Sequence, residues 1–447
     1  MTDLGDLAKH VLDQAGDGEQ LEVMVQRQSD TEVRARDGDV ESFTAADSLG
    51  VGVRIVAHHR QGFAYTGSFD IAAIDQAVND ARDNASFGTE DEYLGLAEPD
   101  GVDYPELDLL SPGYTATTTD RKIELALALE AAVRAADERV VGVDTLEYAD
   151  ARAEWIVANT HGIWAESVES VAYAMAWIIV SQGDETHEGY AAEVGRCAAD
   201  LDIDKCATDA TTRGLRMFGA TKPKSSRVTI VLEQSPSADF VSLIGSTLSG
   251  ESVLKKRSPF VDRLGDSIAA PQVQLLDDPS DPEAFTASQT DGEGLATRPN
   301  FLIEDGVLSR FVYDTYNARR AATVSTGSAV RGGYRSTPVA GTQALSLRPG
   351  SASIEELIGS VDHGVLVAEL QGLHSGVNPI SGDFSTGVTG IAIRDGALAE
   401  PIREATIAST LQRMLLDVSA IGAEVERLPG GATGVPLVIE DITLSGS

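Results

Sequence analysis

The chain has 447 residues, of which 42% are hydrophobic, and carries a formal net charge of −36 from 34 Lys and Arg against 70 Asp and Glu. This length predicts two or three domains, and the charge argues against a nucleic acid or an anionic membrane as the main partner. Because the acidic residues are spread along the whole chain, we expect a solvated acidic surface suited to a salt-rich cytoplasm, where salt screens the self-repulsion.

The sequence leads us to expect neither a signal peptide nor a membrane-spanning helix. The first six residues, Met-Thr-Asp-Leu-Gly-Asp, lack the basic and apolar regions of a signal peptide. The most apolar run, residues 171–180, is roughly half the length that a membrane-spanning helix needs. We therefore expect a soluble, cytoplasmic protein. The two cysteines, Cys197 and Cys206, are predicted to be small packing residues rather than a disulfide or metal ligands.

Residues 1–86 are predicted to form a small α+β domain. Leu4, Leu7, Ala8 and Val11 recur at helical spacing, so the chain should begin with an amphipathic helix. Apolar alternation then indicates strands, and a second apolar stripe indicates a second helix. The expected strands cover residues 21–25, 31–36, 49–56 and 62–65, and the second helix covers residues 70–84.

Residues 87–119 are rich in Gly, Pro and acids without a sustained period, which is typical of a linker or a surface loop. Residues 120–225 are predicted to form a middle α+β domain with an antiparallel sheet. Its helices should cover residues 120–137 and 202–218, and its strands residues 140–148, 154–158, 163–168 and 173–180.

Residues 226–447 are predicted to form a large β-rich C-terminal domain, which makes the whole chain an α+β protein. Turn signals such as Gly332-Gly333 separate its strands. We expect strands over residues 228–232 and 436–444, and helices over residues 237–250, 353–361 and 406–420.

Zinc peptidases hold two histidines one helical turn apart with a carboxylate as base. The seven histidines of this chain show no such spacing, and His187-Glu188 lacks a second histidine downstream. Ser252 and Lys255 match the Ser-x-x-Lys spacing of serine acyl enzymes, but the companion motifs are absent. The residues alone therefore predict no metal site and no nucleophile.

Two polar segments remain as candidate sites. Asp291 and Glu293 lie in a glycine-rich turn, where they could act as a general acid and base; solvated side chains of a tight turn are the interpretation we favour. The loop of residues 372–385 gathers glycines, hydroxyls, His374 and Asn378. It is suited either to close approach of another chain or to an ordinary hairpin connection.

An ordered set of motifs in the last domain resembles the TldD/PmbA family of zinc-dependent peptidases and their partner subunits. The motifs are Leu264-Gly-Asp, Leu276-Asp-Asp-Pro279, Asp291-Gly-Glu-Gly with Thr297, Ala318-Arg319, Ser325-Thr-Gly327, Asn378-Pro-Ile-Ser-Gly-Asp-Phe-Ser385 and Thr406-Ile-Ala408. The resemblance covers essentially the whole chain and is weakest before Ser86.

Catalytic members of that family carry His-Glu-x-x-x-His on the helix after the first strand of this domain, with a cysteine near the C-terminus. Here those positions hold Val241, Ser242 and Ser246, and no cysteine follows Cys206. The chain thus resembles the PmbA type, also called TldE, which has no zinc of its own. The resemblance implies that zinc lies on a TldD-type partner.

The same resemblance implies a role in degrading or trimming small unfolded peptides as half of a TldD/TldE pair, with a homodimer as another possible assembly. The residues that we expect to line the peptide chamber are Asp291, Glu293, Thr297, His374, Asn378, Ser381 and Asp383.

Two other functions stay open at this stage. One is a peptidase acting alone through Asp291, Glu293, His374 and Asp383. The other is a protein modulator of the gyrase-modulator type, without a peptide chamber. Ser409-Thr410 replace the family's usual Gly-Asn, and with the acidic composition this departure leads us to expect a halophilic archaeal source.

Overall fold

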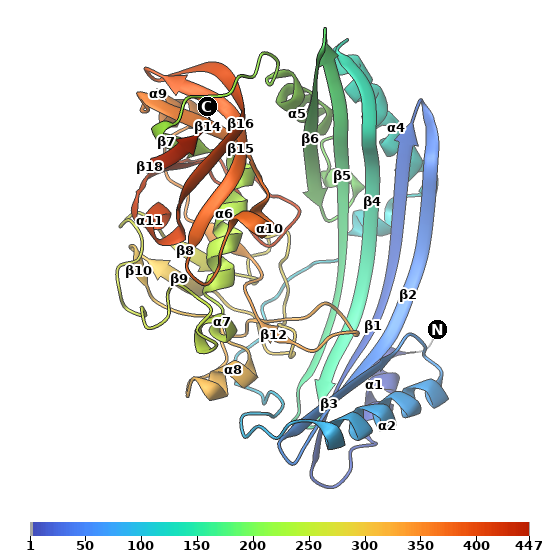
Figure 1. Cartoon of the computed structure of the whole chain (residues 1–447). Helices are drawn as coiled ribbons and strands as arrows, with labels where there is room; N and C mark the ends of the chain where they lie inside the picture. The colour runs from blue at the N-terminus through green and yellow to red at the C-terminus, as the bar shows by residue number, and fades with distance from the viewer. Residues whose placement is uncertain (1–2, 447) are drawn as a thin grey trace.

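The computed structural model describes residues 3–446, and its first half is built on one antiparallel sheet in the order β3-β2-β1-β4-β5-β6 (Figure 1). Strands from both sides of residues 87–119 share this sheet, because β1 pairs with β2 and with β4. The strands are β1 (Glu19–Arg36), β2 (Asp39–Ala57), β3 (Arg60–Thr66), β4 (Val140–Asn159), β5 (Trp164–Gln182) and β6 (Glu185–Gly195).

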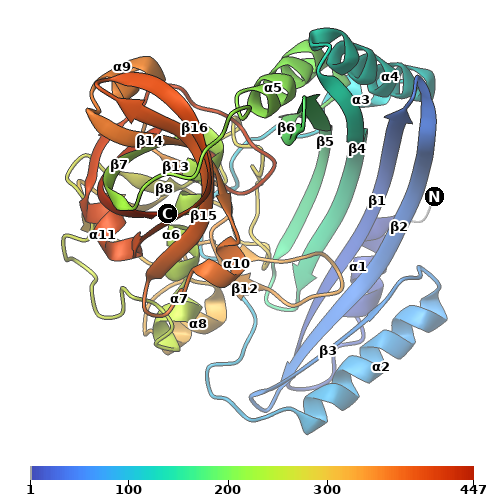
Figure 2. The same ribbon diagram turned by 45° about the horizontal axis from the view of Figure 1, so that its top comes forward.

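Two pairs of helices cover one face of this sheet. Leu21 and Val25 of β1 pack under α1 (Leu4–Leu12) and α2 (Ile71–Phe87). Val33 and Ala35 pack under α4 (Thr119–Ala136) and α5 (Ile203–Leu215). All four are odd-numbered residues of one strand, and alternate side chains of a strand point to the same face. Both helix pairs therefore lie on the same side, at opposite ends of the sheet (Figure 2). The helices of this half are α1 (Leu4–Leu12), α2 (Ile71–Phe87), α3 (Pro112–Ala116), α4 (Thr119–Ala136), the short η1 (Ala198–Asp200) and α5 (Ile203–Leu215).

The C-terminal half contains a second sheet in the order β16-β15-β14-β7-β18-β17, and it closes on itself because β16 also pairs with β18. Its strands are β7 (Ser226–Leu232), β14 (His363–Gln371), β15 (Asp383–Arg394), β16 (Ala397–Thr410), β17 (Val418–Ile421) and β18 (Leu437–Ser445). Beside it lie the sheet β10-β9-β8-β13 and the pair β11-β12. These strands are β8 (Leu275–Asp277), β9 (Asn300–Glu304), β10 (Val307–Leu308), β11 (Ala329–Val330), β12 (Val339–Ala340) and β13 (Leu345–Leu347).

One helix of the C-terminal half, α6 (Gln234–Thr247), contributes Phe240 and Ile244 to the largest core of the molecule. The remaining helices are short: α7 (Gly250–Leu254), α8 (Thr315–Arg320), α9 (Ile354–Gly359), α10 (Leu373–Gly376) and α11 (Leu411–Leu416). Within residues 3–446 we find no helix that is long and apolar enough to cross a membrane.

The two halves are joined by an arm, residues 331–338, which connects β11 to β12 and reaches onto the long sheet (Figure 1). Tyr334 packs there against Met24 and Val157. Glycines make room for it: a Cβ on Gly50 would lie 2.1 Å from the Tyr334 ring, and a Cβ on Gly52 would lie 2.2 Å from the Tyr334 carbonyl oxygen. The arm therefore needs strand positions without side chains.

The predicted α+β class is confirmed, and the helices expected near residues 70–84, 120–137 and 202–218 are present as α2, α4 and α5. The prediction of one helix over residues 406–420 is wrong. Residues 406–410 belong to β16, where they pair with β15, and only α11 is helical. The ladder with β15 and β18 outweighs the local apolar spacing.

Candidate functional site

The three positions that correspond to the zinc motif His-Glu-x-x-x-His lie on α6, but their side chains do not form a metal site. Val241 is 2% exposed in the core and carries no donor atom, whereas Ser242 and Ser246 are exposed. The Ser246 hydroxyl donates a hydrogen bond to the Leu243 carbonyl at 2.7 Å. Zinc sites need imidazole, thiolate or carboxylate ligands, so these residues do not fit the metal. Between residues 3 and 446 no group of three or more His, Cys, Asp or Glu could hold a metal ion.

The glycine-rich acidic turn is buried, so the expectation of solvated carboxylates is wrong. Asp291 and Glu293 are 3% and 1% exposed. The Asp291 carboxylate accepts hydrogen bonds from the amides of Glu293, Leu295 and Ala329 at 2.9, 3.0 and 3.1 Å. Such bonds close the turn, which is a structural role. Thr297, also buried, donates its hydroxyl to the Ser288 carbonyl at 2.5 Å.

Glu293 belongs to a buried ionic network that also includes residues of the long sheet and the arm. Glu22 of β1 is bound by Arg54 of β2 at 2.5 Å and by Arg331 of the arm at 2.8 Å. Arg54 also lies 3.6 Å from Glu293. No sequence pattern predicts this network, because its members come from strands and loops far apart in the chain.

The network holds more acids than bases. Burial is the largest cause that raises the pKa of Asp314, which caps α8. Burial, followed by the charge of Glu293, raises the pKa of Asp291 to about 8 despite the three donating amides. Burial likewise raises the pKa of Glu293. Two arginines, Arg54 and Arg331, face these acids, so protonation of a carboxyl relieves the excess negative charge.

The loop of residues 372–385 is well formed and exposed. Asn378 accepts hydrogen bonds from the amides of Ile380 and Ser381 at 2.9 and 3.3 Å. The Ser381 hydroxyl donates to Asp383 at 2.6 Å. The tip side chain, Ile380, is 52% exposed. The loop thus presents a rigid turn to the outside, which suits contact with another molecule.

The sequence-predicted residues therefore fall into two sets that lie in different surroundings. Asp291, Glu293 and Thr297 are buried between the halves. The second set, which is exposed, comprises His374, Asn378, Ser381 and Asp383. No hydrogen bond or ion pair of the described chain connects the two sets, so the geometry offers no shared site for the group Asp291, Glu293, His374 and Asp383.

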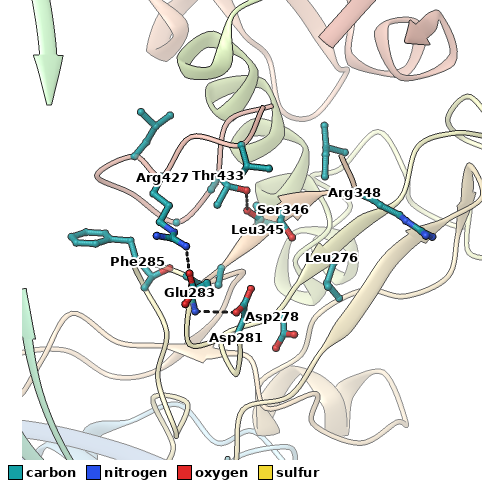
Figure 3. Close-up of a pocket in the computed structure, with 18 of the residues that line it drawn as sticks. Leu276, Asp278, Asp281, Glu283, Phe285, Leu345, Ser346, Arg348, Arg427 and Thr433 are labelled. Atoms are coloured by element: carbon teal, nitrogen blue, oxygen red, sulfur yellow. Dashed lines mark hydrogen bonds and ion pairs between the residues drawn. The ribbon is translucent and has the colours of Figure 1, made fainter. Parts of the chain in front are cut away.

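A cavity of about 470 Å³ lies within the C-terminal half and contains none of the sequence-predicted residues (Figure 3). Leu276 and Leu345 contribute apolar surface, and the ion pair between Arg427 and Glu283 lies at its side. Asp281 accepts a hydrogen bond from the Glu283 amide at 2.9 Å, which fixes the acidic loop (Figure 3).

A second cavity, which we call the α5 cavity, has a volume of about 680 Å³ and separates β5, β6 and α5 from the start of α6 and from β14. Trp177 and Tyr190 are 40% and 42% exposed, and their rings meet edge to face at 6.2 Å. Glu233 and Arg216 form a two-point ion pair at 2.6 and 2.7 Å. Aromatic surface beside polar groups is typical of a ligand-binding cleft.

A third cavity, which we call the central cavity, has a volume of about 440 Å³ and lies between the long sheet and the C-terminal half. Gln28, Trp155 and Glu169 project into it from β1, β4 and β5. Thr290 and Asp291 line the opposite side. Of the residues predicted from the sequence, Asp291 thus borders the central cavity.

Comparison with known proteins covers nearly the whole chain. Residues 21–85, 114–218 and 225–446 match domain 1, the central domain and the C-terminal domain of the PmbA/TldA metallopeptidases. Metalloprotease PmbA of Escherichia coli O157:H7 is 26% identical over 415 residues, which cover 92% of this chain and 89% of that protein.

Solved structures share the fold. A proposed modulator of DNA gyrase from Bacteroides thetaiotaomicron VPI-5482 matches with a TM-score of 0.90 at 25% identity over 99% of both chains. TldE from Thermococcus kodakarensis matches with a TM-score of 0.88 at 24% identity, again over 99% of both chains. Three consecutive domain matches and a shared fold over the full length lead to one conclusion: the chain belongs to the PmbA/TldA metallopeptidase family.

Proposed function

We propose that this chain is the zinc-less, PmbA/TldE-type subunit of a two-subunit metalloprotease that degrades or trims small unfolded peptides. The observation that carries the proposal is the composition of α6. Its three motif positions are a buried valine, Val241, and two serines, Ser242 and Ser246. These side chains cannot replace two imidazoles and a catalytic carboxylate, so the hydrolytic chemistry would lie on a TldD-type homologue.

The cavities between the halves support a role in peptide binding. β6 pairs with β5 alone among the strands of the described chain, so one of its edges is free, and residues 186–190 of β6 line the α5 cavity. The Tyr190 carbonyl on this strand accepts a hydrogen bond from Arg213 at 3.0 Å. An extended peptide can add to such an edge through its main chain. Trp177 and Tyr190 would then contact its side chains.

The exposed loop of residues 372–385 supports a role in pairing. Its turn is fixed by Asn378 and carries the exposed Ile380 at its tip. Gln412 also donates to the Ser381 carbonyl at 2.9 Å, which ties the loop to α11. A rigid loop with an apolar tip loses little conformational entropy on binding, so we assign it to contact with the zinc-bearing partner.

The test is to assay this chain and a TldD-type homologue from the same cell, separately and mixed, at high salt. We expect no zinc and no peptide cleavage for this chain alone, formation of a complex, and a gain or change in cleavage in the mixture. Changing the glutamate of the partner's His-Glu-x-x-x-His to glutamine should abolish cleavage, whereas Ser242→Ala in this chain should leave it intact.

Two outcomes would overturn the proposal. Stoichiometric zinc with cleavage by the isolated chain would identify it as a peptidase in its own right. Failure to form a complex, with cleavage by the partner unchanged, would remove the subunit role and leave a binding or modulator protein. Light scattering of the isolated chain distinguishes a homodimer from a monomer in the same samples.

A further inference from the structure

The strand β5 presents a row of apolar side chains to the face of the long sheet that the helices leave uncovered. Its even-numbered residues are buried under α4 and α5, as for Ala172, Ala174 and Ala176. The odd-numbered residues therefore point to the opposite face. Each of these side chains is at least partly exposed, and none belongs to a hydrophobic core of the described chain; they are Val171, Tyr173, Met175 and Trp177.

This apolar row extends from one cavity to another. Val171 lines the central cavity, and Trp177 lines the α5 cavity. Six residues of an extended strand separate the two positions, which corresponds to about 20 Å. Apolar side chains that stay partly in water between two cavities indicate a surface that an elongated ligand covers.

The neighbouring strand β4 forms a trough beside this row. On the same face, directly opposite the row of β5, it carries three alanines: Ala149, Ala151 and Ala153. The rows of β5 and β1 on either side of them are about 10 Å apart, because two strand spacings separate them. The Tyr173 hydroxyl donates a hydrogen bond to Glu147, which closes the trough at one end. We call the space above the three alanines the β4 trough.

The other wall of the β4 trough is polar and comes from β1. In the ladder between β1 and β4, Asp30 pairs with Ala151 and Glu32 pairs with Ala149. The two carboxylates therefore lie on the same face as the alanines, two residues apart along the strand. The trough thus has an apolar wall from β5 and an acidic wall from β1.

The acidic wall carries more negative than positive charge. Asp30 forms no ion pair with the described residues, and its carboxylate accepts a hydrogen bond from Gln28 at 2.6 Å. Glu32 is 37% exposed and shares the Arg34 guanidinium with Glu147, at 2.9 and 2.8 Å. Three carboxylates against one guanidinium leave an excess of negative charge, which is complementary to a basic side chain.

We propose that the β4 trough binds an extended peptide segment in which apolar and basic residues alternate, with Val171 and Tyr173 contacting the apolar residues and Asp30 and Glu32 the basic ones. Successive side chains of an extended chain point to opposite sides, so alternate residues meet opposite walls. The two acids have the same two-residue spacing as the basic side chains of such a peptide. The inference rests on the proposed function for the peptide nature of the ligand and adds a sequence pattern to it.

The experiment is calorimetric titration of the full-length chain, at one salt concentration, with three five-residue peptides that are blocked at both ends. The first is valine-lysine-valine-lysine-valine. The second has the same composition in the order lysine-lysine-valine-valine-valine, and the third has glutamate in place of each lysine of the first. We expect the first to bind about fivefold or more tightly than the second and about 10-fold or more tightly than the third. Because the first two carry equal charge, general attraction to the acidic surface affects both alike.

A variant that combines Asp30→Asn with Glu32→Gln tests the acidic wall, because the amides remove both charges and keep the size of the side chains. The advantage of the alternating lysine peptide over the glutamate peptide should fall about 10-fold. The matched control combines Asp39→Asn with Asp47→Asn, which removes the same charge from two exposed positions of β2 outside the trough. That control should keep the order of the three affinities.

Ala151→Leu tests the trough itself and gives an independent test should the carboxylate variant fail to fold. The larger side chain would fill the floor of the trough, and Ala151 is half-buried outside the cores, so the fold should be retained. We expect binding of the alternating peptide to weaken about 10-fold or more. Ala45→Leu is the control: Ala45 is exposed and pairs with Thr31, on the opposite face of the sheet. Circular dichroism checks the fold of each variant.

Equal affinities for the two lysine peptides, absence of binding by all three peptides, or an advantage that survives both the carboxylate variant and Ala151→Leu would overturn the inference. These outcomes are separable from a failure of the proposed function, because they are measured without the partner. A chain that shows the expected order of affinities but neither binds nor alters the TldD-type homologue would keep the trough as a peptide site and lose the subunit role.

Discussion

Arg331 and Glu22 are 309 positions apart in the chain and form an ion pair of 2.8 Å in which both side chains are at most 2% exposed. Glu22 belongs to the long sheet and Arg331 to the arm of the C-terminal half. Arg54 binds the same carboxylate at 2.5 Å. The pair therefore fastens the two halves at the border of the central cavity.

Arg331→Ala should destabilise the chain by about 3–5 kcal/mol, because it leaves Glu22 buried with one arginine instead of two. The free energy of unfolding from urea titration measures the loss. Arg335→Ala is the control on the same arm: its side chain is exposed and donates to the Tyr334 hydroxyl at 3.0 Å. Equal effects of the two changes would contradict the fastening role of Arg331.

Gly52→Ala should displace the arm. The new Cβ would lie 2.2 Å from the Tyr334 carbonyl oxygen, which is backbone and cannot rotate away. We expect a loss of about 1–3 kcal/mol, as for overpacking, and faster proteolysis within residues 331–338. Gly142→Ala on β4 is the control, since its Cβ would meet Ile179 at an ordinary 3.5 Å. An arm that stays resistant to protease in Gly52→Ala would exclude this account.

The buried carboxyl group of Asp291 should make stability fall as pH rises. Burial beside Glu293 raises its pKa to about 8, whereas an unfolded aspartate titrates near 3.9. The folded chain thus holds a proton that the unfolded chain releases between roughly pH 4 and pH 8, and this proton alone contributes a slope of up to ~1.4 kcal/mol per pH unit.

Asp291→Asn should flatten the dependence of the unfolding free energy on pH within that window, whatever it does to the absolute stability. Asp103→Asn removes the charge of an exposed carboxylate as a control and should leave the slope as it is. Denaturant titrations at pH 5, 6, 7 and 8 measure the three slopes. If the unfolding free energy of Asp291→Asn depended on pH as steeply as that of the native chain, the proton would be held by a group other than Asp291.

Asn378→Ala should loosen the exposed loop without affecting the core. The change removes the acceptor of the Ile380 and Ser381 amides. A lost hydrogen bond of about 1 kcal/mol predicts roughly fivefold faster amide exchange at these two positions. Ser375→Ala, whose hydroxyl donates to the Gly372 carbonyl at 3.2 Å, is the control within the same loop. Unchanged exchange in Asn378→Ala would mean that the turn is held by its backbone.

The strands of the long sheet show which structural features the local sequence pattern predicts and which it does not. Residues 173–180 belong to the most apolar run of the chain and are predicted as a strand, and the structure confirms them as part of β5. The pattern does not reveal that β5 runs for 19 residues or that β1 pairs with β4, for example Gln26 with Trp155. Such pairing depends on hydrogen bonds between residues more than a hundred positions apart.

The sequence by itself determined the family motifs, the amphipathic helices and the loss of zinc ligands at Val241, Ser242 and Ser246, since each depends on residue type and spacing. Only the tertiary structure decided that Asp291 and Glu293 are buried and that Arg331 of the arm pairs with Glu22 of the long sheet. The physical reason is that burial and charge pairing are set by neighbours from distant strands. The residue type of an acidic side chain is the same whether water or an arginine surrounds its carboxylate, so the sequence alone does not distinguish the two cases.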